Sequence, residues 1–198
     1  MVHSPNTSRA AQLVDRSQRE ARNEHLGAVI WLTGLSGSGK STLASEAERR
    51  LFGLNYQTYM LDGDNLRHGL NSDLAFSPHD RSENIRRAGE VSALLADAGL
   101  IVICAFISPY QNDRDRARKA ATGCFHEIYV KASLATCEEC DPKGLYRLAR
   151  AGSIKDFTGI SAPYEPPAAP ELIIDTQGSD IATCIASLVG YICQSCKT

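Results

Sequence analysis

The sequence lacks a long hydrophobic run. Its longest apolar stretches, Ala28–Leu32 and Leu100–Ile107, fall far short of the roughly 20 residues that a membrane-spanning helix requires. It also lacks a strong charge of one sign, because 21 basic and 23 acidic residues leave a formal net charge of -2. Without a cationic field there is no general attraction to nucleic-acid phosphates. We therefore expect no membrane partner and no nucleic-acid partner.

The cysteines do not have the pattern of a secreted protein. Seven cysteines, an odd number in 198 residues, are more typical of reduced cytoplasmic thiols than of a disulfide framework. Two CxxC spacings, Cys137 with Cys140 and Cys193 with Cys196, lie far apart in helical patterns, which disfavours a shared zinc site. Residues 1–23 are polar and contain no apolar segment of the kind found in a secretory signal. We expect a cytoplasmic location.

Strand-like and helical stretches alternate along the chain. With 43% hydrophobic and 22% charged residues, the composition is that of a globular protein. Apolar runs and helical spacing predict strands at 28–33, 56–61, 100–107, 126–130 and 171–174, and helices at 40–52, 80–98, 112–121 and 179–192. Such alternation predicts an α/β fold, a parallel sheet of about five strands with helices on both faces.

Two segments stand outside this alternation. Residues 1–25 are predicted to form a polar N-terminal arm with a short helix that docks on the rest, and residues 26–198 to form the main domain. Residues 141–170 are rich in Gly, Pro and charge, and are too long for a plain connector. Loops of this kind usually act as lids, so we predict a mobile lid here.

A glycine-rich stretch, Gly34–Ser41, fits the pattern GxxxxGK[ST] between a predicted strand and a predicted helix. In this context the backbone N–H groups and the helix N-terminus wrap a polyphosphate. Lys40 would neutralise the outer phosphates, and the Ser41 hydroxyl would bind Mg²⁺. The residues predicted to bind ATP as co-substrate are Gly34, Leu35, Ser36, Gly37, Ser38, Gly39, Lys40, Ser41 and Thr42.

Two carboxylates, Asp62 and Asp64, follow the second predicted strand. Ligands of parallel sheets lie beyond the carboxyl ends of the strands, so both residues are expected beside the phosphate loop. Either could hold Mg²⁺ or accept the proton of an acceptor hydroxyl, whereas a helix N-cap suits Asp64 better than Asp62. We favour Asp62 for the chemistry and, together with Ser41, as a metal ligand.

Fixed cations are dense in the next segment: Arg67, Arg81, Arg86 and Arg87. The last three cannot share one helical face, so some are expected to be solvated or paired with acidic side chains. An anionic acceptor would explain Arg67 and Arg81 in loops, because a guanidinium fork matches sulfate or phosphate oxygens. Phe76 and Phe157 lie in polar loops and could stack on a base, or could equally be partly buried anchors.

Several of these segments together carry a resemblance to a known family. They are Leu61–Leu70, Phe76–Pro78 with Asp80–Arg81, Glu83–Arg87, Phe106–Tyr110, Asp141–Tyr146 and Phe157–Ile160. In this order and spacing they resemble the adenylyl-sulfate kinase (APS kinase) family, over a stretch that runs from Arg16 to Asp175. The resemblance implies an enzyme of the phosphate-loop kinase fold that uses ATP and Mg²⁺.

The resemblance further implies the reaction and the substrate site. The γ-phosphate of ATP would pass to the 3′-hydroxyl of adenosine 5′-phosphosulfate (APS), giving 3′-phosphoadenylyl sulfate in sulfate assimilation. The residues implied at the APS site are Asp62, Gly63, Asp64, Asn65, Arg67, Phe76, Arg81, Asn84, Ile107, Ser108, Lys143, Phe157 and Thr158. The two phenylalanines would enclose the adenine. Family members with a similar N-terminal arm tend to be homodimers, so a homodimer is expected.

Three residues are candidates for catalysis: Asp62, Lys40 and Ser108. Ser108 matches a position that the family labels as a phosphoserine intermediate. Direct in-line transfer to the sugar hydroxyl is physically simpler, because no neighbouring base for Ser108 is visible in the sequence.

The sequence also departs from the family. Cys140 stands where an Arg is usual, and Asp156 and Ser161 replace a common Gly and a common Asp. Arg147 or Arg150 could take over the role of the missing Arg near ATP. A kinase of the same architecture that acts on another nucleotide or sugar is the main alternative. A GTP-dependent switch is disfavoured, because no Asn-Lys-x-Asp segment is present.

Overall fold

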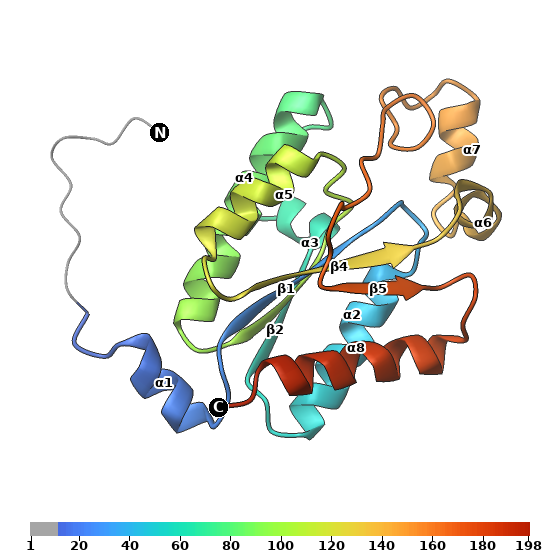
Figure 1. Cartoon of the computed structure of the whole chain (residues 1–198). Helices are drawn as coiled ribbons and strands as arrows, with labels where there is room; N and C mark the ends of the chain where they lie inside the picture. Colours follow the sequence, from blue (N-terminus) through green and yellow to red (C-terminus); the bar gives the residue numbers. More distant parts are fainter. Residues whose placement is uncertain (1–11) are drawn as a thin grey trace, which may run out of the picture.

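Five parallel strands form the centre of the molecule in the computed structural model, which describes residues 12–198 (Figure 1). The strands are β1 (Ala28–Thr33), β2 (Thr58–Asp62), β3 (Ile101–Ala105), β4 (Phe125–Lys131) and β5 (Leu172–Asp175). Their order in the sheet is β2-β3-β1-β4-β5, and every neighbouring pair is parallel. The predicted α/β fold with a five-stranded parallel sheet is confirmed. β1 and β3 are buried along their whole length, as expected for strands covered on both faces.

Helices cover both faces of the sheet (Figure 1). Those in the described residues are α1 (Arg16–Asn23), α2 (Lys40–Gly53), α3 (Gly63–Arg67), α4 (Pro78–Asp97), α5 (Gln111–Ala120), α6 (Leu134–Cys140), α7 (Leu145–Arg150) and α8 (Ile181–Ser195). Ile30 and Leu32 of β1 join the core cluster under α2 and α8, whereas Val29 and Trp31 join the cluster under α4 and α5. This alternation follows from the two-residue period of a strand, and it gives the molecule two apolar cores.

The short helix α1 packs at the amino end of the sheet. The Arg16 guanidinium donates to the Gly27 carbonyl at 2.7 Å, and the Asn23 amide donates to the Gly99 carbonyl at 2.9 Å. Asp15 caps the helix with a reciprocal bond to Gln18. This helix therefore packs against the amino end of the sheet. The first eleven residues of the predicted arm lie outside the described residues.

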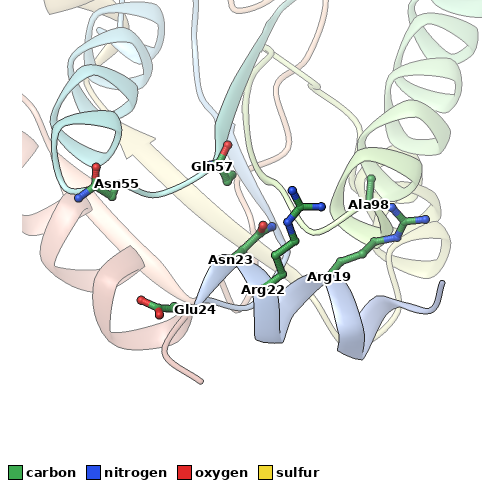
Figure 2. Close-up of a pocket in the computed structure, with 7 residues that line it drawn as sticks. All are labelled: Arg19, Arg22, Asn23, Glu24, Asn55, Gln57 and Ala98. Carbon is green, nitrogen blue, oxygen red and sulfur yellow. The ribbon is translucent and has the colours of Figure 1, made fainter.

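A polar cavity of about 500 Å³ opens beside α1, at the end of the sheet opposite the carboxyl ends of the strands (Figure 2). Its lining residues are Arg19, Arg22, Asn23, Glu24, Asn55, Gln57 and Ala98.

Within residues 12–198 no helix is both long and apolar enough to cross a membrane. The seven cysteines all fall in this range and all are free thiols, and no cluster of three or more His, Cys, Asp or Glu there is arranged to hold a metal ion.

Three short helices differ from the sequence-based expectations. The acidic turn after β2 is the start of α3, α6 contains the first CxxC pair, and α7 lies inside the predicted lid. Each has seven residues or fewer, too short for a helical period to be read from the sequence. α6 and α7 lie beyond the carboxyl end of the sheet, on the same side as the phosphate loop (Figure 1).

Candidate active site

The phosphate loop, Gly34–Ser41, connects the buried β1 to α2, as the motif predicts. Gly37 has φ 77°, and a Cβ there would lie 3.0 Å from the Cys137 carbonyl oxygen. Gly39, the N-cap of α2, has φ 93°. Side chains are disfavoured at both positions, so the loop can keep its tight curve only with glycine. Ser41 and Thr42 lie in the first exposed turn of α2, beside the free N–H groups of the helix terminus.

Lys40 folds back into the loop. Its ammonium donates to the Leu35 carbonyl at 2.6 Å and to the Ser38 hydroxyl at 3.3 Å, and the residue is only 7% exposed. Burial lowers the pKa of Lys40 to about 8, against smaller opposing effects of Cys137 and Asp62. The loop therefore holds a desolvated cation that a polyphosphate would stabilise.

Asp62, the last residue of β2, lies between the phosphate loop and α3. One carboxylate oxygen accepts a hydrogen bond from the Ser41 hydroxyl at 2.8 Å, and the other accepts from the Asp64 backbone N–H at 2.9 Å. The N-cap of α3 is therefore Asp62, not Asp64, which corrects the preference drawn from the sequence. Strand β2 ends at Asp62, and its backbone turns into the helix there, so this carboxylate is the first side chain able to reach the orphan N–H groups. Gly63, Asp64 and Asn65 form the first turn of α3.

Ser41 and Asp62 are also the oxygen ligands that suit Mg²⁺. Both side chains are accessible, and their oxygens lie 2.8 Å apart. Mg²⁺ in phosphoryl-transfer sites is typically held by one or two protein oxygens, with waters and substrate phosphates completing the octahedron. The residues present fit such an ion.

Four residues predicted at the acceptor site are brought together by Arg81. Its guanidinium donates to the Phe76 carbonyl and to the Thr158 hydroxyl, both at 2.9 Å. Arg67 donates to the carbonyls of the same turn, and its guanidinium lies 4.2 Å from the centroid of the Phe76 ring. Burial lowers the pKa of Arg67 from its usual value. Phe76 is 62% exposed, so one ring face carries a cation and the rest of the ring is accessible.

The remaining predicted substrate residues come from the lid and from α4. Lys143 forms an ion pair with Asp64, and this carboxylate raises the pKa of the lysine. Phe157 is buried in the lid, with its ring 5.0 Å from that of Tyr146 in an edge-to-face arrangement. Asn84 is buried as well, and its side-chain oxygen accepts from the Asn71 amide at 2.9 Å.

Ser108 lies buried in a turn with a left-handed backbone conformation. It has φ 39° and is 1% exposed, and its hydroxyl accepts a hydrogen bond from the Trp31 indole at 3.1 Å. The neighbouring Ile107 carbonyl accepts from the Thr33 hydroxyl at 2.7 Å. The hydroxyl of Ser108 has no hydrogen bond to a side chain that could act as its base in the described residues.

Arg114 is a supporting residue that the sequence did not reveal. Its guanidinium binds Glu127 at 2.6 Å, and it donates to the carbonyls of Ser108 and Glu165, both at 2.8 Å. The side chains of Arg114 and Glu127 are 1% and 4% exposed. This buried pair fastens the turn that carries Ser108 to the end of the lid. In the sequence, Arg114 is only one of several cations in a basic helix.

The other cations behave as surface groups. Arg86 pairs with Glu83 at 2.7 Å, and Arg87 pairs with Asp73 at 2.6 Å, which confirms that some arginines of α4 are paired with acidic side chains. Arg150 pairs with Glu138 at 2.6 Å. Arg147 lines a hollow of about 560 Å³ in the lid, together with Glu138, Asp141, Pro142, Lys143 and Gly144.

Comparison with known proteins adds to this geometry. The family model described as adenylylsulphate kinase matches residues 26–175. A curated adenylyl-sulfate kinase from Oceanobacillus iheyensis is 58% identical over 180 residues, which cover 90% of each chain.

Solved structures of APS kinases are also similar to this chain. The APS kinase of Mycobacterium tuberculosis in complex with AMPPNP and APS is 46% identical, with a TM-score of 0.78 over 85% of this chain and 96% of that one. A hexameric APS kinase from Thiobacillus denitrificans is 31% identical, with a TM-score of 0.67 over 90% of this chain and 32% of that one. The phosphate loop, Asp62 and Arg81 all lie within the region that the family model matches.

Proposed function

This chain belongs to the adenylylsulphate kinase family, and we propose that its residues transfer the γ-phosphate of ATP to the 3′-hydroxyl of APS. The observation that carries the assignment of roles is the hydrogen bond between Ser41 and Asp62. It places a carboxylate from the end of β2 directly beside the loop that holds the polyphosphate. ATP, the phosphate donor, and APS, the phosphate acceptor, can therefore meet at the Asp62 carboxylate.

The phosphate loop binds the donor. Its backbone N–H groups and the N-terminus of α2 surround the β- and γ-phosphates, and Lys40 leaves the Leu35 carbonyl to bind their oxygens. The oxygens of Ser41 and Asp62 would hold Mg²⁺, which when bound would neutralise the developing negative charge. Positioning and electrostatics of this kind are the main catalytic factors in phosphoryl transfer.

The acceptor binds on the other side of Asp62. Arg67 and Arg81 offer guanidinium groups to the phosphosulfate, while Phe76 and Phe157 flank the adenine. Asp62 accepts the proton of the 3′-hydroxyl as that oxygen attacks the γ-phosphorus in line. Asp64, Asn65 and Lys143 orient the ribose side of the same ligand.

Ser108 takes no covalent part in this scheme. A buried hydroxyl that is bonded to Trp31 and has no base beside it is poorly suited to attack ATP. We assign Ser108 the role of shaping the APS site, together with Ile107 and with Arg114, which donates to the Ser108 carbonyl. Transfer is direct from ATP to the sugar.

Two further assignments belong to the proposal. We propose a cytoplasmic location, because an odd number of cysteines, seven, is more typical of reduced cytoplasmic thiols than of a disulfide framework. A homodimer is the assembly that we propose, and size-exclusion chromatography with light scattering tests it against a monomer or a higher oligomer.

A direct assay tests the proposed function. The purified protein, supplied with ATP, Mg²⁺ and APS, is expected to form 3′-phosphoadenylyl sulfate and ADP in equal amounts. With AMP or shikimate in place of APS it is expected to turn over slowly, because neither carries a sulfate for the two arginines. Preference for another acceptor, or phosphorylation at another position of APS, would overturn the assignment.

A further inference from the structure

Tyr146 lies between the two halves of the site and has no assigned role there. It is in α7, within the lid, and is 2% exposed. Its hydroxyl donates to the Ser36 carbonyl of the phosphate loop at 2.9 Å. Its ring meets Phe157 edge-on, with the planes at 80° and the centroids 5.0 Å apart. One side chain therefore touches a backbone atom on the donor side and an aromatic ring on the acceptor side.

The phosphate loop end of this contact lies beside a bond that a bound polyphosphate would break. The Lys40 ammonium donates to the carbonyl of Leu35, the residue that precedes Ser36. A bound polyphosphate would draw the ammonium away and release that carbonyl, which would change the backbone to which Tyr146 is bonded. The Ser36 carbonyl is therefore placed to report whether the loop is filled.

At its other end, Tyr146 contacts Phe157, which adjoins the residues proposed to bind APS. Phe157 is followed by Thr158, whose hydroxyl binds Arg81, and Arg81 in turn holds the Phe76 carbonyl. A ligand base packed on Phe157 would fix this ring, and edge-to-face contact would then restrict the ring of Tyr146. Both substrates thus bias the same side chain.

We propose that Tyr146 is a positioning residue that couples the two substrate sites, so that nucleotide in the phosphate loop tightens binding of APS and the reverse. The inference rests on the proposed function, because it takes ATP and APS as the two ligands. Coupling of this kind is reciprocal by thermodynamic linkage. Burial raises the pKa of Tyr146, which keeps the hydroxyl a donor throughout the neutral range.

The test is the variant Tyr146→Phe, which keeps the ring and removes only the hydroxyl. Tyr191→Phe is the matched control, because it removes a tyrosine hydroxyl that is bonded at 2.7 Å to His126, on α8 and away from the site. The dissociation constant of APS is measured by calorimetry without and with saturating AMPPNP, and that of AMPPNP without and with APS. The ratio of the two constants is the coupling factor.

For the wild type we expect a coupling factor of at least about fivefold, the lower end of typical coupling between sites. In Tyr146→Phe the factor is expected to fall by about 3- to 10-fold, but not below unity, which is the loss that one hydrogen bond accounts for. The affinity for each ligand alone should stay within about twofold of the wild type, and Tyr191→Phe should keep the full factor.

Several results would overturn the inference. One is an unchanged coupling factor in Tyr146→Phe, and another is a loss of affinity for both separate ligands with the factor retained, which marks a purely structural role. A wild type without coupling is a third. Failure of the proposed function looks different: the wild type would then form no 3′-phosphoadenylyl sulfate, whatever the variant does.

A second variant follows the contact to its other end. Phe157→Leu removes the ring edge and is expected to reduce the coupling factor, in addition to weakening APS binding. If both residues act along one line, the double variant loses no more coupling than the worse single variant. Independent, additive losses would mean that Tyr146 does not act through Phe157.

Discussion

The donor half and the acceptor half of the site are built in different ways. The phosphate loop is one continuous segment, Gly34–Ser41, held between a fully buried strand and a helix, and its ligand groups are mostly backbone N–H. The acceptor half is assembled from side chains of separate segments, including α3, the turn at Phe76, α4 and the lid. A backbone cradle is organised by the core itself, whereas a side-chain cleft depends on contacts that are individually weak.

The contacts that hold the acceptor half differ widely in strength. Lys143 and Asp64 form an ion pair with side chains that are 61% and 62% exposed, and such pairs contribute at most about 1 kcal/mol. In the Arg67–Phe76 stack the ring is exposed, while Arg67 is half-buried. Arg114 and Glu127 are the exception, because they form a buried pair that holds the Ser108 carbonyl. Most of the acceptor half can therefore rearrange, while its floor is fixed.

Removal of Lys40 gives the largest expected effect on activity. Lys40 is the only buried lysine among the described residues, so its loss leaves the phosphate loop without a buried ammonium. For Lys40→Ala, kcat/KM for ATP should fall by about 10³-fold or more, the scale of losing a charge-stabilising donor. Steady-state kinetics at saturating APS measure this. Lys119→Ala, an exposed lysine at the end of α5, is the control and should retain full activity. A loss below about tenfold in Lys40→Ala would contradict the assigned role.

Arg114→Met tests the fixed floor of the acceptor half. It leaves the buried Glu127 carboxylate without its partner, so the free energy of unfolding should fall by about 3–5 kcal/mol. Urea denaturation measures the loss. Of the two substrates, APS should suffer the larger rise in KM, because Arg114 holds the Ser108 carbonyl and not the phosphate loop. Arg49→Ala, which removes an exposed pair with Glu46, should change stability by less than about 1 kcal/mol.

Asp62→Asn separates chemistry from binding at the point where the halves meet. The amide oxygen can still cap α3, and the amide NH2 can donate to the Ser41 hydroxyl, but the side chain cannot take the proton of the attacking hydroxyl. We expect kcat to fall by about 100-fold or more, with the dissociation constant of AMPPNP nearly unchanged. Asp97→Asn, at the exposed end of α4, is the control. An unaltered kcat in Asp62→Asn would assign the base to another group.

The difference between the halves also explains what the sequence could predict. The phosphate loop is contiguous and lies between a strand and a helix that each have a clear period, so its residues and its place in the fold followed directly. The parallel sheet followed from the same alternation. The acceptor residues could be named only through a family resemblance, because nothing local in the sequence brings Arg67, Arg81 and Thr158 together.

Long-range partners were the part that the sequence could not supply. Arg114 and Glu127 lie on different elements, and their exclusion from water depends on how α5 packs on β4. Tyr146 is in a six-residue helix after a glycine, where no period marks an inward face. The two hydrogen bonds of Asp62 could not be predicted either, because an aspartate after a strand can cap a helix or face the phosphate loop. Here one carboxylate oxygen caps α3 and the other accepts from Ser41.

The lid should respond to ligands more than the phosphate loop does. In the structure its acceptor face is attached through Lys143 and Thr158 to groups that the substrate would also contact. With AMPPNP and APS both at about ten times their dissociation constants, trypsin cleavage at the exposed Lys155 should slow by about tenfold. Cleavage after Lys119, far from the site, should slow much less. Equal rates at Lys155 with and without the ligands would show that residues 141–170 do not close.

The smallest expected effect concerns the proton on Lys40. Burial disfavours the charged form of this ammonium and lowers its pKa to about 8. Bound polyphosphate favours the charged form and raises the pKa, so binding above pH 8 must first recapture a proton. AMPPNP affinity should therefore fall by about fourfold from pH 7 to pH 8.5 and stay flat just below pH 7. Lys40→Arg keeps its charge and should lose this slope, whatever its absolute affinity. A slope that persists in that variant would belong to another group, and the phosphate loop would then be less desolvated than its geometry indicates.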